Sequence, residues 1–226
     1  PSIRRSRVQA IFRTFGYPEH VADMLGALCT TSTPPHIWRN CGIDCNQAQL
    51  QIARTLYRPS HLPQGAPTSP AIANLCSWRL DRRLAGLARA AGANYTRYAD
   101  DLAFSGDEAF ARHAARFAIH VAAIALEEGF PVHHRKTRLM RPGVRQHLAG
   151  IIINQHSNIP RRDFDQLKAI LTNCIRTGPD AQNRAGHPDF RAHLGGRIAF
   201  VESIHAARGQ RLRALFQRVP WPQELS

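Results

Sequence analysis

Apolar residues return every three or four positions through most of the chain, the spacing that places them on one face of an α-helix. This pattern predicts helices over residues 4–30, 70–91, 107–128, 161–177, 188–206 and 208–218. The first range is interrupted at Gly16-Tyr17-Pro18, because glycine and proline disfavour a continuous helix. Residues 31–68 are rich in Thr, Ser, Pro, Cys and Gly and predict a loop, apart from a short element near 47–57.

The helix predicted over 70–91 has signals at both ends. Pro70 lies in its first turn, where the missing N–H costs nothing, and Ser69 is expected to cap its N-terminus. Gly92 follows the last helical residue and is expected to end the helix.

Two segments favour β-structure instead. Between Tyr95 and Ser105, β-prone residues flank Ala99-Asp100-Asp101, which predicts a strand, a tight turn and a second strand. Residues 147–154 include the run Ile151-Ile152-Ile153, which is also typical of a strand. The central order of helix, β-hairpin, helix and strand predicts an α+β fold with part of a ferredoxin-like split βαβ layout, followed by a helical lobe.

The charge of the chain is strongly basic and unevenly distributed. Its 226 residues contain 30 Lys and Arg against 16 Asp and Glu, a net charge of +14. Residues 61–110 balance five basic with five acidic side chains, whereas residues 111–226 carry 18 basic and eight acidic ones. A preference for arginine codons would raise the charge evenly. The distribution therefore favours an acidic centre beside a basic lobe, as in an enzyme that holds a polyanion.

Cysteine spacing and hydropathy favour a cytoplasmic protein without a membrane span. Five irregularly spaced cysteines argue against a disulfide framework. Cys41 and Cys45 have the spacing of half a zinc site, but no second Cys/His pair matches it, so we expect plain loop cysteines. The best apolar run, from Phe117 to Leu126, is short and interrupted by His120.

Two adjacent carboxylates stand in the predicted hairpin turn, within the tetrapeptide Tyr98-Ala99-Asp100-Asp101. Like charges on neighbouring residues repel each other, and a divalent cation removes that cost. Mg²⁺ binds readily to one or two carboxylates together with substrate phosphates, so the pair is a candidate metal platform. A solvated Asp-Asp turn is the structural alternative.

A second motif, Leu62-Pro63-Gln64-Gly65-Ala66-Pro67-Thr68-Ser69-Pro70, lies immediately before a predicted helix. Gly65 allows a nucleotide or another chain segment to approach the backbone closely. Pro67 and Pro70 stiffen the segment, and the helix N-terminus that follows favours negative charge. An ordinary proline-rich turn with a helix cap is the alternative.

Together the two motifs make the chain resemble the reverse transcriptases, and most closely the bacterial retron-type group. The likeness is carried by Gln64-Gly65-Ala66-Pro67-Thr68-Ser69-Pro70 with Asn74, and by Tyr95-Thr96-Arg97-Tyr98-Ala99-Asp100-Asp101-Leu102 with Phe104-Ser105-Gly106. Further similarities follow in the same order and cover nearly the whole chain: Gly129-Phe130 with Lys136-Thr137-Arg138, Arg145-Gln146 with Gly150-Ile151-Ile152-Ile153-Asn154, Asn158-Ile159-Pro160-Arg161, and residues 194–216 with Ala207-Arg208-Gly209.

The resemblance implies an RNA-directed DNA polymerase that adds dNTPs to a primer 3′-hydroxyl with the help of two Mg²⁺ ions, or of Mn²⁺. It implies that Asp100 and Asp101 bind the metal ions and that Lys136 lies near the triphosphate as a general acid. The residues that it places around the incoming nucleotide, the templating base and the primer terminus are Gln64, Gly65, Ala66, Pro67, Tyr98 and Ala99, and those in the primer grip include Gly150 and Ile151. It also implies that the Arg-rich helices after residue 161 hold an RNA–DNA duplex by its shape.

The resemblance further implies a right-hand polymerase, with a palm and the end of the fingers over 1–155 and a helical thumb over 156–226. In the family, a first catalytic Asp precedes a Phe-Phe-Pro-Ser-Ile segment, and Pro1-Ser2-Ile3 resembles the end of that segment. We therefore expect a fragment that lacks the fingers and a third metal-binding carboxylate and that is inactive alone. The sequence departs from the family at His133, often Asn, and at Leu148-Ala149-Gly150, where retron enzymes commonly have Val-Thr-Gly.

Other functions remain open. A group II intron-type or other bacterial reverse transcriptase is one, although the intron enzymes tend to have Gly-Gly after the motif's glutamine. A polymerase relic that only binds nucleic acid is the alternative from a different class. The expected partners are an RNA template, a DNA or RNA primer and dNTPs. A retron would add a noncoding RNA and an effector protein in anti-phage defence.

Overall fold

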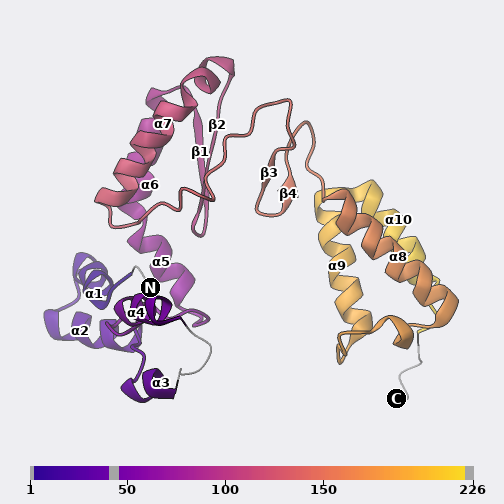
Figure 1. The fold of residues 1–226 in the computed structure, drawn as a ribbon, viewed down its shortest axis with the longest axis horizontal. Helices are drawn as coiled ribbons and strands as arrows, with labels where there is room; N and C mark the ends of the chain where they lie inside the picture. Colours follow the sequence, from indigo (N-terminus) through magenta and orange to yellow (C-terminus); the bar gives the residue numbers. More distant parts are fainter. Residues whose placement is uncertain (1–2, 41–45, 222–226) are drawn as a thin grey trace. The chain divides into compact units, whose positions relative to one another are not determined.

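The computed structural model of the chain describes residues 3–40 and 46–221, and it divides into two compact units, Pro1–Leu139 and Met140–Ser226. The first unit contains α1 (Arg5–Thr14), α2 (Glu19–Leu28), α3 (Pro35–Asn40), α4 (Gln47–Tyr57), α5 (Ser69–Cys76), α6 (Trp78–Ala90), β1 (Asn94–Tyr98), β2 (Asp101–Ser105) and α7 (Glu108–Glu127) (Figure 1). The second contains β3 (His147–Leu148), β4 (Ile151–Ile152), α8 (Arg161–Thr177), the 3₁₀-helix η1 (Asp180–Gln182), α9 (Phe190–Ile204) and α10 (Ala206–Gln217).

Most of the predicted elements are confirmed. The strand predicted over 147–154 is instead the short antiparallel hairpin β3–β4, because the chain turns at Ala149 and Gly150. The other differences are local. The helix predicted over 70–91 is two helices, α5 and α6, which are divided at Ser77. The hydroxyl and the backbone N–H of Ser77 both donate to the carbonyl of Ala73, at 2.9 and 3.1 Å. Ser69 is the first residue of α5 and not its cap, which is Thr68. The helix α3 lies in a segment predicted to be a loop.

The hairpin β1–β2 is covered by α6 and α7. The strands pair in antiparallel register, with Tyr95 opposite Phe104 and Arg97 opposite Leu102, so these four side chains share one face. That face packs on buried residues of the two helices: Leu80, Leu84, Ala88, Phe117, Val121 and Ala125. The ring centroids of Tyr95 and Phe104 lie 5.1 Å apart in a stacked arrangement. The hairpin is therefore anchored to a helical core.

A smaller cluster holds the segment that precedes α5. Leu62 is buried together with Val8 of α1 and with Ile72 and Cys76 of α5. Leu62 also donates its backbone N–H to the carbonyl of Ile3 at 2.9 Å. The start of the second sequence motif is thus fixed against α1 and α5.

The second unit is a three-helix lobe with its own apolar core. Its buried residues come from α8, α9, α10 and the flanking segments: Ile159, Leu167, Leu171, Cys174, Leu194, Ile198, Val201, Leu212 and Val219. Arg213 of α10 forms a two-pronged ion pair with Glu202 of α9, with Nε–Oε1 and Nη2–Oε2 distances of 3.0 and 2.6 Å. The three basic helices predicted from the sequence therefore pack together around one core.

The two sheets consist of one hairpin each. Within residues 3–40 and 46–221, β1 pairs with β2 and β3 pairs with β4. An α-rich chain with small sheets agrees with the predicted α+β class, but the split βαβ sheet is absent from this described part. The predicted palm–thumb boundary at 155/156 stays a prediction, although the compact units meet at 139/140. The Cys41–Cys45 pair lies outside the described residues.

The helix α7 is the one described helix that is long and apolar enough to cross a membrane, judged by length and composition alone. The mean hydropathy of this helix is high, although the helix contains no long unbroken run of apolar residues. One side of α7, with Ala114, Phe117, Val121 and Ala125, is buried in the first unit. Core helices pass the same test, so we treat α7 as part of the core.

The packing of α9 against α10 predicts a severe effect of Gly209→Ala. A Cβ atom at position 209 meets the backbone Cα of Glu202 at 2.5 Å and its N at 2.7 Å, so the helices must separate. We expect a loss of about 1–3 kcal/mol in the free energy of unfolding, measured by urea denaturation. Gly196→Ala in α9 is the matched control, because its Cβ meets nothing within 4 Å and alanine is the better helix former. Equal losses in the free energy of unfolding for the two substitutions would contradict the close packing of α9 against α10 at Gly209.

Candidate active site

The two adjacent carboxylates lie at the exposed tip of the β1–β2 hairpin. Asp101 opens β2 opposite Tyr98, so Ala99 and Asp100 form the two-residue turn between the strands. Asp100 and Asp101 are exposed, and 72% of Tyr98 is accessible to solvent. Both carboxylates are therefore free to meet a ligand from solution.

Ala99 has a backbone conformation that a residue with a side chain seldom adopts. Its φ angle is +51°, in the left-handed region that favours glycine. Such a conformation costs an L-residue roughly 1–2 kcal/mol, so the surrounding structure must hold it in place. The turn that carries the acidic pair is thus a strained one.

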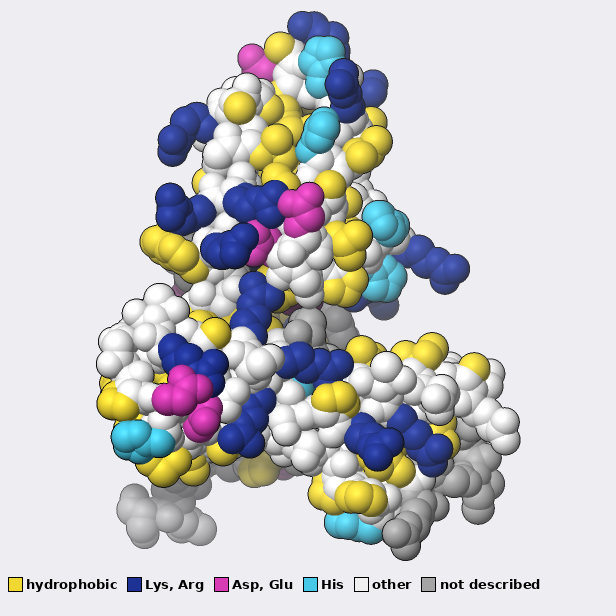
Figure 2. Space-filling model, turned by 90° about the vertical axis from the view of Figure 1, so that its left-hand side faces the viewer, with side chains coloured by type: hydrophobic (Ala, Val, Ile, Leu, Met, Phe, Trp, Pro, Cys, Tyr) yellow, Lys and Arg dark blue, Asp and Glu magenta, His cyan; other side chains and the backbone are white. Residues whose placement is uncertain are grey.

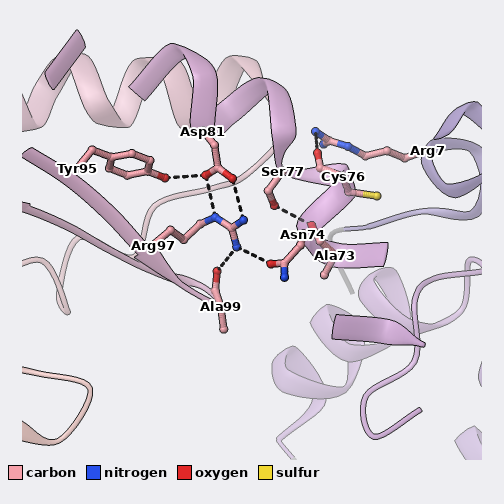
Figure 3. A network of polar contacts seen from close by, with 9 residues as sticks. All are labelled: Arg7, Ala73, Asn74, Cys76, Ser77, Asp81, Tyr95, Arg97 and Ala99. Atoms are coloured by element: carbon pink, nitrogen blue, oxygen red, sulfur yellow. Dashed lines mark hydrogen bonds and ion pairs between the residues drawn. The ribbon is translucent and has the colours of Figure 1, made fainter. Parts of the chain in front are cut away.

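Arg97 binds the carbonyl oxygen of Ala99 and joins the turn to two helices (Figure 3). Its Nη1 donates to Ala99 O at 2.9 Å and to Asn74 Oδ1 of α5 at 3.0 Å. Its Nε and Nη2 donate to the two carboxylate oxygens of Asp81 in α6, both at 2.8 Å. Only 13% of the Arg97 side chain is exposed, and its charge-assisted bonds to Asp81 are partly buried, whereas its bonds to Asn74 and Ala99 lie at the surface.

Asp81 is the anionic centre of this network. Tyr95 donates its hydroxyl to Asp81 Oδ1 at 2.8 Å, in addition to the two bonds from Arg97. Burial disfavours the charged carboxylate, but the hydrogen bonds from Arg97 and Tyr95 and the charge of Arg97 outweigh it and lower the pKa of Asp81. Burial, with the bond to Asp81, raises the pKa of Tyr95, so its hydroxyl stays protonated as a donor.

The second sequence motif folds onto the start of α5. The hydroxyl of Ser69 donates to the carbonyl of Pro63 at 2.7 Å, and its backbone N–H donates to that of Ala66 at 3.1 Å. Gly65 has a φ of +90°, and a Cβ there would meet nothing within 4 Å. Gln64, Gly65 and Pro67 are exposed, and Ala66 is half-buried. These residues form an accessible, fixed segment.

Asn74 joins this segment to the carboxylate turn. It lies on α5, the helix that the second motif opens, and its Oδ1 accepts the bond from Arg97, which also binds Ala99. The structure therefore brings the two sequence motifs together through the contacts Asn74–Arg97–Ala99. Sequence reasoning included Asn74 and Arg97 in the motifs without assigning them a role, and it missed Asp81. Arg97 shares the strand face of Tyr95, which is a signal that it points inward.

Arg7 holds the other end of α5. Its Nη2 donates to the carbonyl of Cys76 at 2.8 Å and its Nη1 to that of Glu128, just after α7, at 2.6 Å (Figure 3 shows the contact with Cys76). The guanidinium also lies over the ring of Phe130, 4.5 Å from its centroid. Nothing in the sequence pattern pointed to this role of Arg7.

The remaining predicted site residues lie on segments other than β1, β2 and α5. Lys136 is exposed in a turn, where its backbone N–H donates to the carbonyl of His133 at 2.9 Å. Gly150 and Ile151 belong to the second unit: Ala149 and Gly150, both with positive φ, form the turn of the β3–β4 hairpin. Their predicted roles near the triphosphate and the primer stay predictions.

The acidic pair is suitable for a hard divalent cation but does not enclose one. Two carboxylates supply the oxygen ligands that Mg²⁺ prefers, and an exposed site leaves room for water and phosphate oxygens. Within residues 3–40 and 46–221, no group of three or more His, Cys, Asp and Glu side chains is arranged to hold a metal ion.

Residues 21–170 match the profile of a family described as "Reverse transcriptase (RNA-dependent DNA polymerase)". The chain belongs to the reverse transcriptase family. The match includes the segment before α5, the β1–β2 hairpin and the loop of Lys136. This confirms the family that the two sequence motifs predicted.

Nearly the whole chain is similar in sequence to individual reverse transcriptases from retrons. The Retron Mx65 reverse transcriptase of Myxococcus xanthus is 36% identical over 216 residues, which cover 94% of this chain and 45% of that protein. The Retron Mx162 reverse transcriptase of the same organism is 32% identical, with 93% and 43% covered. For the Retron Ec86 reverse transcriptase of Escherichia coli the values are 25% identity, 94% and 55%. The chain thus spans about half the length of these curated relatives, and the retron-type resemblance is confirmed.

The lowered pKa of Asp81 predicts a pH dependence of stability. The ionised carboxylate stabilises the fold fully above its unfolded pKa of about 3.9, and this contribution is lost as the pH falls through the lower folded value. We expect Asp81→Asn to cost about 1–3 kcal/mol near neutral pH, because charged hydrogen bonds are lost. The difference from the unmodified chain in urea denaturation should shrink as the pH falls below about 3.9.

Asp165→Asn is the control for this measurement. Asp165 forms an exposed ion pair with Arg161 at 3.4 Å, which contributes little to stability. A constant effect of Asp81→Asn across the acid range, or an equal effect of Asp165→Asn, would show that the ionised Asp81 does not stabilise the fold.

Proposed function

We propose that this chain carries the catalytic carboxylates of an RNA-directed DNA polymerase of the retron type. In this reaction the 3′-hydroxyl of a primer attacks a dNTP, and pyrophosphate leaves. The observation that carries the proposal is the set of contacts Asn74–Arg97–Ala99, which fixes the acidic turn next to the helix opened by the second family motif. Polymerisation needs a metal platform and a nucleotide-binding segment held in constant relation to each other.

Asp100 and Asp101 are the residues that we assign to Mg²⁺, with Mn²⁺ as the alternative, since both ions accept carboxylate oxygens. The bound ions would activate the primer hydroxyl and neutralise the charge of the leaving pyrophosphate. The chain's own contribution is the exposed turn that carries two consecutive carboxylates. A third carboxylate ligand is expected outside the described pair.

The segments around the turn are assigned to the substrates. The accessible residues Gln64, Gly65, Ala66 and Pro67 suit contact with the incoming dNTP and the templating base. Tyr98 and Ala99 flank the carboxylates and suit the primer terminus. We assign Lys136 to the triphosphate, as a general acid, and Gly150 and Ile151 to the primer.

The second unit is proposed to be the thumb that holds the template–primer duplex, and the first unit to contain the palm. Residues 111–226 carry the basic excess of the chain. Figure 2 shows a face of the first unit, on which lysine and arginine side chains are also spread widely, whereas acidic ones gather in a few places. Arg-rich helices suit a duplex that is bound through phosphates and by shape.

The biological setting is part of the proposal. Similarity to retron reverse transcriptases supports a noncoding retron RNA as template, and we extend this to an effector protein and a role in anti-phage defence. Cys29, Cys76 and Cys174 are free cysteines, so we place the reaction in the reducing cytoplasm.

Asp101→Asn is predicted to reduce primer extension by at least about a thousandfold, because a metal ligand is lost. Extension of a radiolabelled DNA primer on an RNA template is measured with the complete reading frame that encodes the chain, since the chain spans about half of its relatives' length. Affinity for the RNA–DNA duplex should stay within about threefold, because phosphate contacts dominate it.

Glu108→Gln is the matched control, since it removes one exposed negative charge in the same unit, at the start of α7. It should leave extension nearly unchanged. If the unmodified complete protein binds duplex but does not extend a primer, the polymerase proposal fails and the nucleic-acid-binding relic is favoured. If Asp101→Asn extends normally, Asp101 is not a metal ligand.

A hollow in the second unit predicts where the duplex backbone is bound. It is lined by Phe164, Lys168, Arg211, Leu212 and Leu215. Lys168→Ala and Arg211→Ala should each weaken duplex binding uniformly across sequences and reduce the slope of log affinity against log salt by about 1. Fluorescence anisotropy at several salt concentrations measures both quantities. An unchanged slope for both variants would place the duplex elsewhere.

A further inference from the structure

We propose that Arg97 is a positioning residue that holds the Asp100–Asp101 turn in its metal-binding geometry and couples it to the nucleotide-binding segment. This inference rests on the proposed function and adds to it a residue that touches neither metal nor substrate. It starts from the strained turn and from the side chain that binds its carbonyl oxygen. The four donor–acceptor distances of Arg97 lie between 2.8 and 3.0 Å.

The geometry of the guanidinium explains why this contact set needs arginine. Nε and Nη2 face both oxygens of Asp81, which fixes the plane of the group. Nη1 then points at the carbonyl of Ala99 and at Asn74 Oδ1 together. A lysine ammonium donates from a single point and cannot span the carboxylate and the turn at once.

The direction of the coupling follows from the elements involved. Asp81 lies on α6, which packs in the core beneath the hairpin, so it is a fixed anchor for Arg97. Asn74 lies on α5, whose first turn is tied to Pro63 through Ser69. A displacement of the nucleotide-binding segment is therefore transmitted through α5 and Arg97 to Ala99, the residue before the first carboxylate.

The left-handed Ala99 supports a functional reason for the clamp. A two-residue hairpin turn favours a positive φ at its first residue, as at Ala149, but a residue with a side chain is strained by that φ. The bond from Arg97 to the carbonyl of Ala99 adds a restraint on this turn. Relaxation at Ala99 rotates the peptide that leads into Asp100, so the two carboxylates lose their relative orientation. Displacement of a reacting group by about 1 Å is enough to reduce a rate by about a hundredfold.

The test is Arg97→Lys in the complete reading frame, with kcat, the KM for dNTP and the Mg²⁺ concentration for half-maximal rate as kinetic readouts. We expect kcat to fall about tenfold to a hundredfold and the Mg²⁺ requirement to rise, with a smaller change in the KM for dNTP. Arg83→Lys is the control, because Arg83 pairs with Glu127 and Glu128 between α6 and the end of α7, away from the turn. It should change these constants less than about threefold.

A structural readout separates this inference from the polymerase proposal. Backbone chemical shifts of the 226-residue chain report whether Ala99 keeps its left-handed conformation. We expect Arg97→Lys to shift Ala99 towards ordinary values, while Ala149, left-handed at a φ of +48° in the second unit, stays unchanged as an internal control. Asp81→Asn weakens the anchor of Arg97 without changing Arg97 itself, and it provides a second variant if Arg97→Lys does not fold; it should move Ala99 in the same direction.

The outcomes are distinct. If Ala99 stays left-handed in both variants, Arg97 does not position the turn, whatever the activity. If Arg97→Lys and Arg83→Lys reduce kcat equally, the role of Arg97 is only structural. If Ala99 relaxes but the unmodified complete protein extends no primer, the positioning is upheld and the polymerase proposal fails.

Discussion

The candidate active site depends on one partly buried ion pair. Arg97 is held by both carboxylate oxygens of Asp81, and the same guanidinium binds the turn at Ala99 and the side chain of Asn74. A guanidinium that is mostly buried is costly to leave unpaired, so these contacts favour one arrangement of the site. The same contacts join the Ala99 turn and α5 to α6.

The rest of the first unit supports that pair. The helices α6 and α7 pack on the inner face of the hairpin, which keeps Asp81 opposite Arg97. Arg7 binds the last turn of α5 through the carbonyl of Cys76, so the helix that carries Asn74 is held at both ends. The exposed acidic tip is thus mounted on a rigid base, as a metal platform requires.

The sequence was sufficient to predict most helices, the hairpin turn and the family, because periodicity and turn residues are local signals. It missed the break at Ser77, since an apolar pattern that continues through a kink looks like one helix. It also missed the partnership of Arg97 with Asp81, 16 residues away, because ion pairs between elements leave no periodic mark. The roles of Lys136 and Gly150 depend on substrates, and local pattern cannot establish them.

The most direct test is paramagnetic broadening of the amide signals of the 226-residue chain by Mn²⁺. The account predicts that broadening centres on Asp100 and Asp101 and disappears when both are changed to Asn, because these carboxylates supply the ligands. Broadening centred elsewhere, or broadening at the turn that persists without the two carboxylates, would contradict the assignment of this hairpin as the metal platform of a reverse transcriptase.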